Sequence, residues 1–82
     1  NEDVNETPVR IYPNPSSSHV FIDSKYSIYN LKLYDITGKL IASYDEDVSN
    51  KTKIYTDNLK KGIYILEINS SINKELVKLI KN

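Results

Sequence analysis

The stretch that decides the fold is LKLYDITGKLIASY, residues Leu31–Tyr44. Apolar and polar residues alternate on both sides of residues 35–38, and alternation at period two is typical of β-strands with one buried face. Aspartate at the first turn position and glycine at the fourth fit a type I turn, after which Gly38 can adopt the left-handed conformation of a G1 bulge. The sequence therefore predicts a β-hairpin over residues 31–44.

Other short alternating segments surround this hairpin. The last segment, residues 74–81, has apolar positions that are compatible with a helix as well as with a strand. The strands that precede it favour a further strand, which would complete a two-layer sandwich. The predicted fold is all-β, an immunoglobulin-like seven-stranded antiparallel β-sandwich. Its strands are expected at residues 9–12, 19–23, 28–35, 39–44, 52–56, 63–69 and 74–81.

The sixth expected strand is apolar on two faces. Tyr64, Leu66 and Ile68 lie on one face, while Ile63 and Ile65 give the other face an apolar surface. Strands of this kind are usually central and covered on both sides. We therefore expect a central strand that is buried on two sides.

Two connections are expected to bend the chain sharply. Residues 13–15, Pro-Asn-Pro, remove donors from the sheet and take the chain off its edge, and the serines at 16–18 continue that loop. Leu59, Gly62 and Tyr64 have the spacing of a tyrosine corner, in which the tyrosine hydroxyl bonds to backbone a few residues upstream.

Composition excludes several classes of function. Eleven basic and eleven acidic residues give a net charge of zero, which argues against nucleic acid or an anionic membrane as the main partner. The chain has no cysteine, which excludes disulfides, cysteine nucleophiles and cysteine-rich zinc sites.

Residues 1–8 are acidic and poor in apolar residues, so we expect a flexible linker ahead of one domain at residues 9–82. No amino-terminal export signal is visible, and we expect a piece of a larger protein.

No group of residues indicates catalysis or a cofactor. His19 is the only histidine, and Ser18 beside it is expected to point to the opposite side of an extended chain. The acidic residues 45–47 lack the glycine and terminal glutamate of an EF-hand, so we expect a solvated loop rather than a metal site. The only glycines, Gly38 and Gly62, form no phosphate-binding loop. We therefore predict a protein that is not an enzyme and has no catalytic, cofactor or metal residues.

Four tyrosines have two interpretations. Tyr26, Tyr29, Tyr44 and Tyr55 could form an aromatic face that stacks on sugar rings. The alternative is aromatic pairing across strands, which stabilises small sheets by roughly 0.2–1 kcal/mol per pair. The sequence favours cross-strand pairing.

Four segments, in this order, resemble the C-terminal sorting domain of the type IX secretion system, by which Bacteroidota export proteins across the outer membrane. They are an opening strand that runs into Tyr-Pro-Asn-Pro, the central hairpin, a Leu-x-x-Gly-x-Tyr strand and a final lysine-rich strand. The loop after Pro15 departs from the family pattern, since it is rich in serine where the family often has glycine. The residues that carry the resemblance are Tyr12, Pro13, Asn14, Pro15, Asp35, Gly38, Leu59, Gly62 and Tyr64.

The resemblance implies a non-catalytic signal domain at the end of a secreted cargo protein. Such a domain folds in the periplasm, is recognised by the outer-membrane translocon and is commonly removed by a sortase-like peptidase, here in or near residues 1–8. The cargo then reaches the cell surface or the medium. We expect the translocon to recognise the edge of the last strand, at Lys74, Val77, Lys78, Leu79, Ile80 and Lys81. The alternative function is a retained fibronectin-like adhesion or carbohydrate-binding module.

Overall fold

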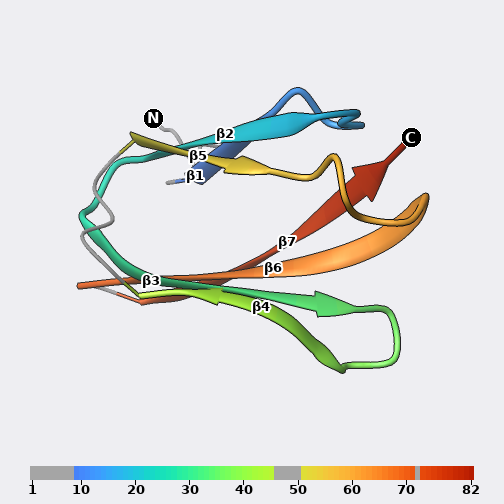
Figure 1. Cartoon of the computed structure of the whole chain (residues 1–82). Coiled ribbons are helices and arrows are strands. Elements are labelled where there is room, and N and C mark those ends of the chain that lie inside the picture. The colour runs from blue at the N-terminus through green and yellow to red at the C-terminus, as the bar shows by residue number, and fades with distance from the viewer. Residues whose placement is uncertain (1–8, 46–50, 72) are drawn as a thin grey trace, which may run out of the picture.

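The computed structural model describes residues 9–45, 51–71 and 73–82, and strands make up most of these ranges (Figure 1). The expected linker and the expected acidic loop beyond Asp45 lie outside the described residues. The ranges that are described hold no helix long and apolar enough to cross a membrane. The strands are β1 (Val9–Tyr12), β2 (His19–Ser24), β3 (Ile28–Asp35), β4 (Leu40–Tyr44), β5 (Lys51–Tyr55), β6 (Gly62–Ser70) and β7 (Lys74–Lys81).

The strands form two antiparallel sheets that face each other as a sandwich (Figure 1). One sheet has the order β1-β2-β5 and the other has the order β4-β3-β6-β7. β4 stays beside β3, whereas in a constant-type immunoglobulin domain the fourth strand joins the opposite sheet. The all-β sandwich predicted from the sequence is confirmed, and its arrangement is consistent with an immunoglobulin-like fold.

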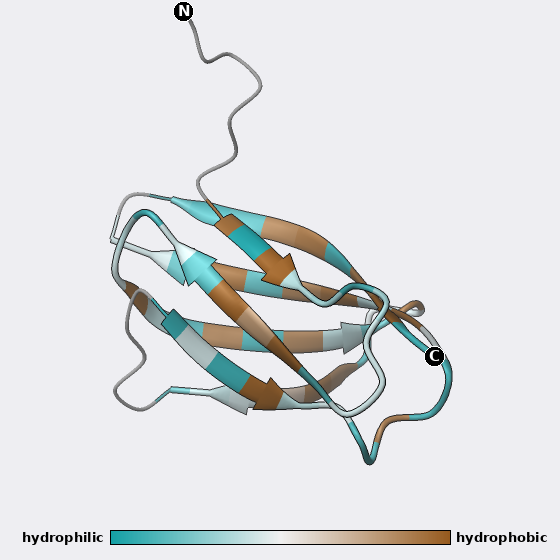
Figure 2. Ribbon diagram, turned by 90° about the horizontal axis from the view of Figure 1, so that it is seen from above, coloured by the Kyte–Doolittle hydropathy of each residue, from teal (hydrophilic) through white to brown (hydrophobic). Residues whose placement is uncertain are grey.

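The core lies between the two sheets and is built from alternate residues of the strands. Hydrophobic and hydrophilic residues accordingly alternate along the ribbons (Figure 2). Because the described strands are short, each one contributes only a few core side chains. The buried apolar residues are Val9, Val20, Ile22, Ile28, Leu31, Leu33, Ile54, Tyr64, Leu66, Ile68 and Leu79.

The predicted hairpin is confirmed as β3 and β4. The amide of Gly38 donates to the carbonyl of Asp35 at 3.0 Å, and the amide of Asp35 donates to the carbonyl of Lys39 at 2.9 Å. Gly38 has a φ of 92°, which the G1 bulge requires and which L side chains rarely adopt. The register also shifts between Leu33 and Tyr34, a second irregularity that the alternation did not predict.

The last strand is also confirmed. β7 pairs with β6 along its whole length, from Gly62 opposite Lys81 to Asn69 opposite Lys74. The helical spacing of its apolar residues therefore has no structural consequence.

β6 is central in its sheet, as predicted, because it lies between β3 and β7. The expected burial on both faces was wrong. Ile63 is 41% exposed on the outer face, and no further layer of described residues covers that face. The reason is that a two-layer sandwich leaves the outer face of each sheet in contact with solvent. Glu67 and Asn69 share this outer face, which makes it partly polar.

Candidate functional site

The segments that carry the family resemblance meet at one end of the sandwich, on the right in Figure 1. The loop after β1, the turn between β3 and β4, the corner before β6 and the end of β7 all lie there. We call this region the motif end and define it as residues 12–18, 35–39, 56–62 and 78–82. Contacts between these segments join residues that are far apart in the sequence.

Asn14 joins the loop after β1 to the edge of β7. Its Nδ2 donates to the carbonyl of Lys78 at 2.9 Å, and its Oδ1 accepts from the amide of Ile80 at 3.0 Å. These are the two bonds that a neighbouring strand would make at this position. Pro13 and Pro15 flank Asn14, so their fixed φ angles restrict the backbone that carries this side chain. We call this pair of bonds the Asn14 bridge.

Ser16 continues this contact with β7. Its amide donates to the carbonyl of Ile80 at 2.7 Å, and its carbonyl accepts from the amide of Asn82 at 2.8 Å. Its side chain is fully buried, and its Oγ lies 3.2 Å from Thr56 Oγ1. Ser16 lies in the loop after β1, as predicted, and it also forms an isolated parallel bridge with Lys81 in the opposite sheet, which the sequence did not predict.

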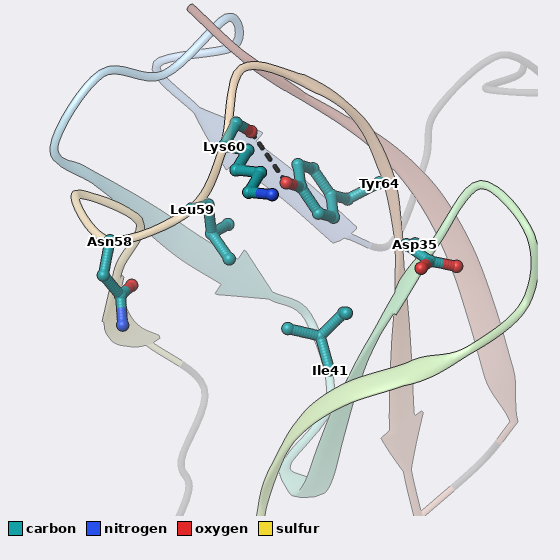
Figure 3. A pocket seen from close by; sticks show the side chains of 6 residues that line it. All are labelled: Asp35, Ile41, Asn58, Leu59, Lys60 and Tyr64. Carbon is teal, nitrogen blue, oxygen red and sulfur yellow. Dashed lines mark hydrogen bonds between the residues drawn. The ribbon is translucent and has the colours of Figure 1, made fainter.

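The predicted tyrosine corner is confirmed. The hydroxyl of Tyr64 donates to the carbonyl of Lys60 at 2.7 Å and fixes the passage of the chain from one sheet to the other (Figure 3). Gly62 has a φ of 152°, and a Cβ at this position would meet nothing within 4 Å. The backbone conformation, rather than a lack of space, therefore favours glycine there.

Hydrogen bonds organise the turn between β3 and β4 around one carboxylate. Asp35 Oδ1 accepts from the hydroxyl of Thr37 at 2.6 Å and from the amides of Thr37 and Lys39 at 2.9 and 3.0 Å. The bond from the Thr37 hydroxyl, followed by that from the Lys39 amide, lowers the pKa of Asp35. Asp35 is thus a turn residue that is stabilised in its charged form.

A half-open pocket of about 310 Å³ lies at the motif end (Figure 3). Two of its polar groups are already used within the protein, since Asp35 binds the turn and the Tyr64 hydroxyl binds the carbonyl of Lys60. These groups do not converge on a common point as they would in a site built for a polar ligand. The lining residues are Asp35, Ile41, Asn58, Leu59, Lys60 and Tyr64.

The residues that the sequence predicts for translocon recognition lie on two different faces of β7. Val77, Leu79 and Lys81 share the inner face, where Leu79 is fully buried. Because side chains alternate along a strand, Lys74, Lys78 and Ile80 share the outer face. The inner residues face the core, whereas on the outer face Lys74 and Lys78 are exposed and Ile80 is half-buried.

Leu76 also lies on the outer face of β7 and is 63% exposed. It is not among the residues that the sequence predicts to contact the translocon. The signal that could have found it is its phase, because it shares the alternation of Lys74 and Lys78.

The relation predicted for Ser18 and His19 was wrong. Ser18 Oγ lies 2.9 Å from His19 Nδ1, because Ser18 precedes β2 and does not follow the alternation of an extended strand. His19 is half-buried and makes an edge contact with Phe21, with ring centroids 5.1 Å apart. Within the described ranges no carboxylate bonds to His19, and no cluster of three or more metal-ligating side chains is present.

The tyrosines form neither of the arrangements considered from the sequence. Tyr44 lies opposite Leu31 and packs against the core, whereas Tyr55 lies opposite His19 in the other sheet. Tyr29 is exposed on β3. The prediction of cross-strand aromatic pairing was wrong. Tyr44 has the aliphatic Leu31 as its partner, and in the described ranges none of the four tyrosines makes a ring contact with another aromatic residue.

A different set of aromatic residues gathers on the outer face of the β1-β2-β5 sheet. The Tyr12 and Phe21 rings lie 5.6 Å apart, and Lys53 Nζ lies 5.6 Å from the Phe21 ring and 5.0 Å from the Tyr55 ring. Arg10 lies over Tyr12 at 5.8 Å. This face combines exposed aromatic rings with positive charge.

The antiparallel sandwich and the four segments joined at one end define a small β-domain organised around its last strand. The chain belongs to the secretion system C-terminal sorting domain family, whose model matches residues 10–82. A search of curated proteins found no match to this chain. The resemblance seen in the sequence is therefore confirmed.

Membership of this family has direct consequences for the function of the chain. The domain is a C-terminal sorting signal of the type IX secretion system and forms part of a cargo protein. The family is one of non-catalytic signal domains. Its members interact with the type IX machinery and are exported across the outer membrane to the surface or the medium.

Proposed function

We propose that this domain delivers a cargo protein, carried ahead of it in the same chain, from the periplasm to the type IX translocon in the outer membrane. It acts as a folded, non-catalytic signal. The family match over residues 10–82 carries this proposal. The motif end supports it, because the contacts of Asn14 and Ser16 fix the last strand within one folded surface.

We also propose that a sortase-like peptidase removes the domain within residues 1–8. β1 begins at Val9, so a cut ahead of that residue would leave every described strand intact. Exposed segments outside a folded domain are preferred sites of proteolysis. Mass spectrometry of the released cargo would identify the new carboxyl terminus, and a terminus beyond Val9 would contradict this proposal.

Recognition by the translocon is proposed to involve the edge of β7 and the outward side chains Lys74, Lys78 and Ile80. An edge strand can pair with an extended segment of a partner through its backbone. Val77, Leu79 and Lys81 contribute by holding the strand in register. Leu79 is fully buried and cannot contact a partner while the domain is folded.

Fusion of residues 1–82 to the carboxyl end of a periplasm-targeted fluorescent protein tests the sorting function. In a bacterium that carries the type IX machinery, we expect fluorescence outside the cell. A host that lacks the translocon should retain the fusion in the periplasm, as should a wild-type host that expresses the fluorescent protein without the domain. A folded fusion that stays in the periplasm of the wild-type host would contradict the proposal.

The exposed aromatic residues on the β1-β2-β5 sheet favour one alternative, a retained adhesion or carbohydrate-binding module. Tyr12, Phe21 and Tyr55 would stack on sugar rings, and Lys53 would bind acidic groups. This function can be tested by titrating the domain with neutral and acidic oligosaccharides while the NMR signals of these rings are monitored. Saturable binding by a domain that is not exported would favour the alternative.

A further inference from the structure

β7 is the longest strand at an edge of either sheet. It has eight residues, whereas the other edge strands, β1, β4 and β5, have four, five and five. A long edge presents unpaired backbone groups that can pair with another strand. What a partner could bind therefore depends on which groups of β7 are already occupied.

Backbone groups of β7 point alternately toward β6 and away from it. The amide of Ser70, the last residue of β6, donates to the carbonyl of Asn73, just ahead of β7. Ser70 and Asn73 are therefore a hydrogen-bonded pair. Because such pairs recur at every second residue of an antiparallel ladder, the odd-numbered residues of β7 direct their backbone groups toward β6. The bonds to Asn14 and Ser16 involve the carbonyls of Lys78 and Ile80 and the amide of Ile80. The even-numbered residues therefore face away from β6.

The Asn14 bridge and Ser16 divide this edge into two parts. From the carbonyl of Lys78 onward, the edge is occupied by atoms of the loop after β1. Ahead of that point lie the amides of Leu76 and Lys78 and the carbonyls of Lys74 and Leu76. No hydrogen bond from the described residues reaches these four groups. We call this part, from Lys74 to the amide of Lys78, the open edge.

The side chains beside the open edge define the chemistry of its partner. Lys74 and Lys78 place two positive charges on the outer face, and Leu76 lies between them with 63% of its surface exposed. The ion pair from Lys74 to Glu67 is long, at 4.0 Å, and the Lys74 side chain is 60% exposed. The Glu67 side chain is only 13% exposed, but the long distance and the exposure of Lys74 leave its ammonium group free to bind a second carboxylate.

We infer that the open edge binds an extended antiparallel strand with the pattern acidic-x-apolar-x-acidic. The apolar residue would lie opposite Leu76 and exchange two backbone hydrogen bonds with it, as in any hydrogen-bonded antiparallel pair. The acidic residues would lie opposite Lys74 and Lys78, where opposite charges stabilise cross-strand pairs. The Asn14 bridge would set the register by blocking further pairing beyond Lys78. This inference rests on the proposed sorting function, in which the strand belongs to the type IX machinery.

A short peptide provides a direct probe of the open edge. We would titrate acetyl-Thr-Glu-Thr-Val-Thr-Glu-Thr-amide into the 82-residue chain and follow backbone amides by NMR. We expect saturable shifts at the amides of Leu76 and Lys78, slower hydrogen exchange at both, and little change at the amide of Ile80. No binding, or shifts centred on another strand, would overturn the inference.

Charge reversal tests the predicted pattern. The double variant Lys74→Glu/Lys78→Glu should bind the acidic peptide about tenfold more weakly, since two attractive cross-strand pairs become repulsive. It should instead bind the matching peptide with lysine in place of glutamate. The control Lys25→Glu/Lys51→Glu makes the same change in net charge on exposed residues away from β7. Equal weakening in both double variants would overturn the inference.

The variant Asn14→Ala tests whether the Asn14 bridge stops a partner strand from pairing beyond Lys78. Removing the side-chain amide of Asn14 frees the backbone carbonyl of Lys78 and the backbone N–H of Ile80. Peptide-induced shifts should therefore extend to Ile80. Unchanged shifts would show that Asn14 does not set the register.

A wild-type fusion that is not exported contradicts the sorting function, whereas normal export of Lys74→Glu/Lys78→Glu contradicts only the inferred partner strand.

Discussion

Lys81 Nζ donates a hydrogen bond to the carbonyl oxygen of Leu59 at 3.0 Å. Lys81 lies near the end of the chain and is only 9% exposed, so its charged group is held against the corner before β6. The same corner is fixed by the bond between Tyr64 and Lys60. The last strand and the tyrosine corner therefore form one structural unit.

Replacing the buried lysine should destabilise this unit. Lys81→Met keeps most of the side-chain volume but removes a part-buried hydrogen bond from a charged group, which is worth about 1.5–3 kcal/mol. Urea denaturation measures this loss. Lys78→Met, at an exposed position of the same strand, should change the free energy of unfolding by less than about 0.5 kcal/mol. Equal losses in the two variants would show that the Lys81–Leu59 bond does not stabilise the fold.

The tyrosine corner gives a second prediction. Tyr64→Phe removes the hydroxyl bond to Lys60 and should lower the free energy of unfolding by about 0.5–1.5 kcal/mol. Tyr29→Phe is the matched control, because Tyr29 is 62% exposed. Thermal or urea unfolding of both variants makes the comparison. If the corner contributes to stability, Tyr64→Phe should lose more free energy of unfolding than Tyr29→Phe. Equal losses would contradict this prediction.

Truncation of two leucines of β7 should change stability to very different extents. Leu79 is fully buried, and Leu79→Ala should cost about 2–5 kcal/mol through lost burial and the cavity that remains. Leu76 is 63% exposed, so Leu76→Ala should change stability by less than about 0.5 kcal/mol. Urea denaturation of both variants tests the orientation of the strand, and reversed effects would contradict it.

The turn carboxylate should make stability depend on pH. Hydrogen bonds lower the pKa of Asp35 in the folded state, so its contribution is present above the unfolded-state pKa of about 4 and is lost as pH falls through the lower folded-state value. Asp35→Asn removes the charge and keeps an acceptor oxygen. The wild type should therefore melt at a higher temperature than the variant at pH 7, and this difference should shrink toward pH 2. A difference that persists at low pH would point to a cause other than the charge.

Local patterns predicted the elements whose determinants lie close together in the sequence. The hairpin followed from alternation around Asp35 and Gly38, and the tyrosine corner followed from residues 59–64. The end of the chain was ambiguous in isolation. It was resolved as a strand because the other strands needed a partner for the open side of the sheet.

Contacts between distant residues could not be predicted in the same way. Asn14 binds Lys78, 64 residues later, and the contact depends on how the loop after β1 crosses between the two sheets. The burial of Ser16 has the same origin. The exposed outer face of β6 was missed because a strand's own sequence does not show how many layers cover it. The open edge could be defined only after these contacts were known.

The most direct test of the account compares export of the fluorescent fusion with that of its Lys78→Pro variant. The amide of Lys78 faces away from β6, so proline removes a donor of the open edge without removing a bond to β6. Ile54→Val is the control, because it destabilises the core by about 0.5–1.5 kcal/mol and leaves the edge of β7 unchanged. We expect the Ile54→Val fusion to be exported, and the Lys78→Pro fusion to remain folded in the periplasm. Normal export of Lys78→Pro would contradict recognition through the edge of β7.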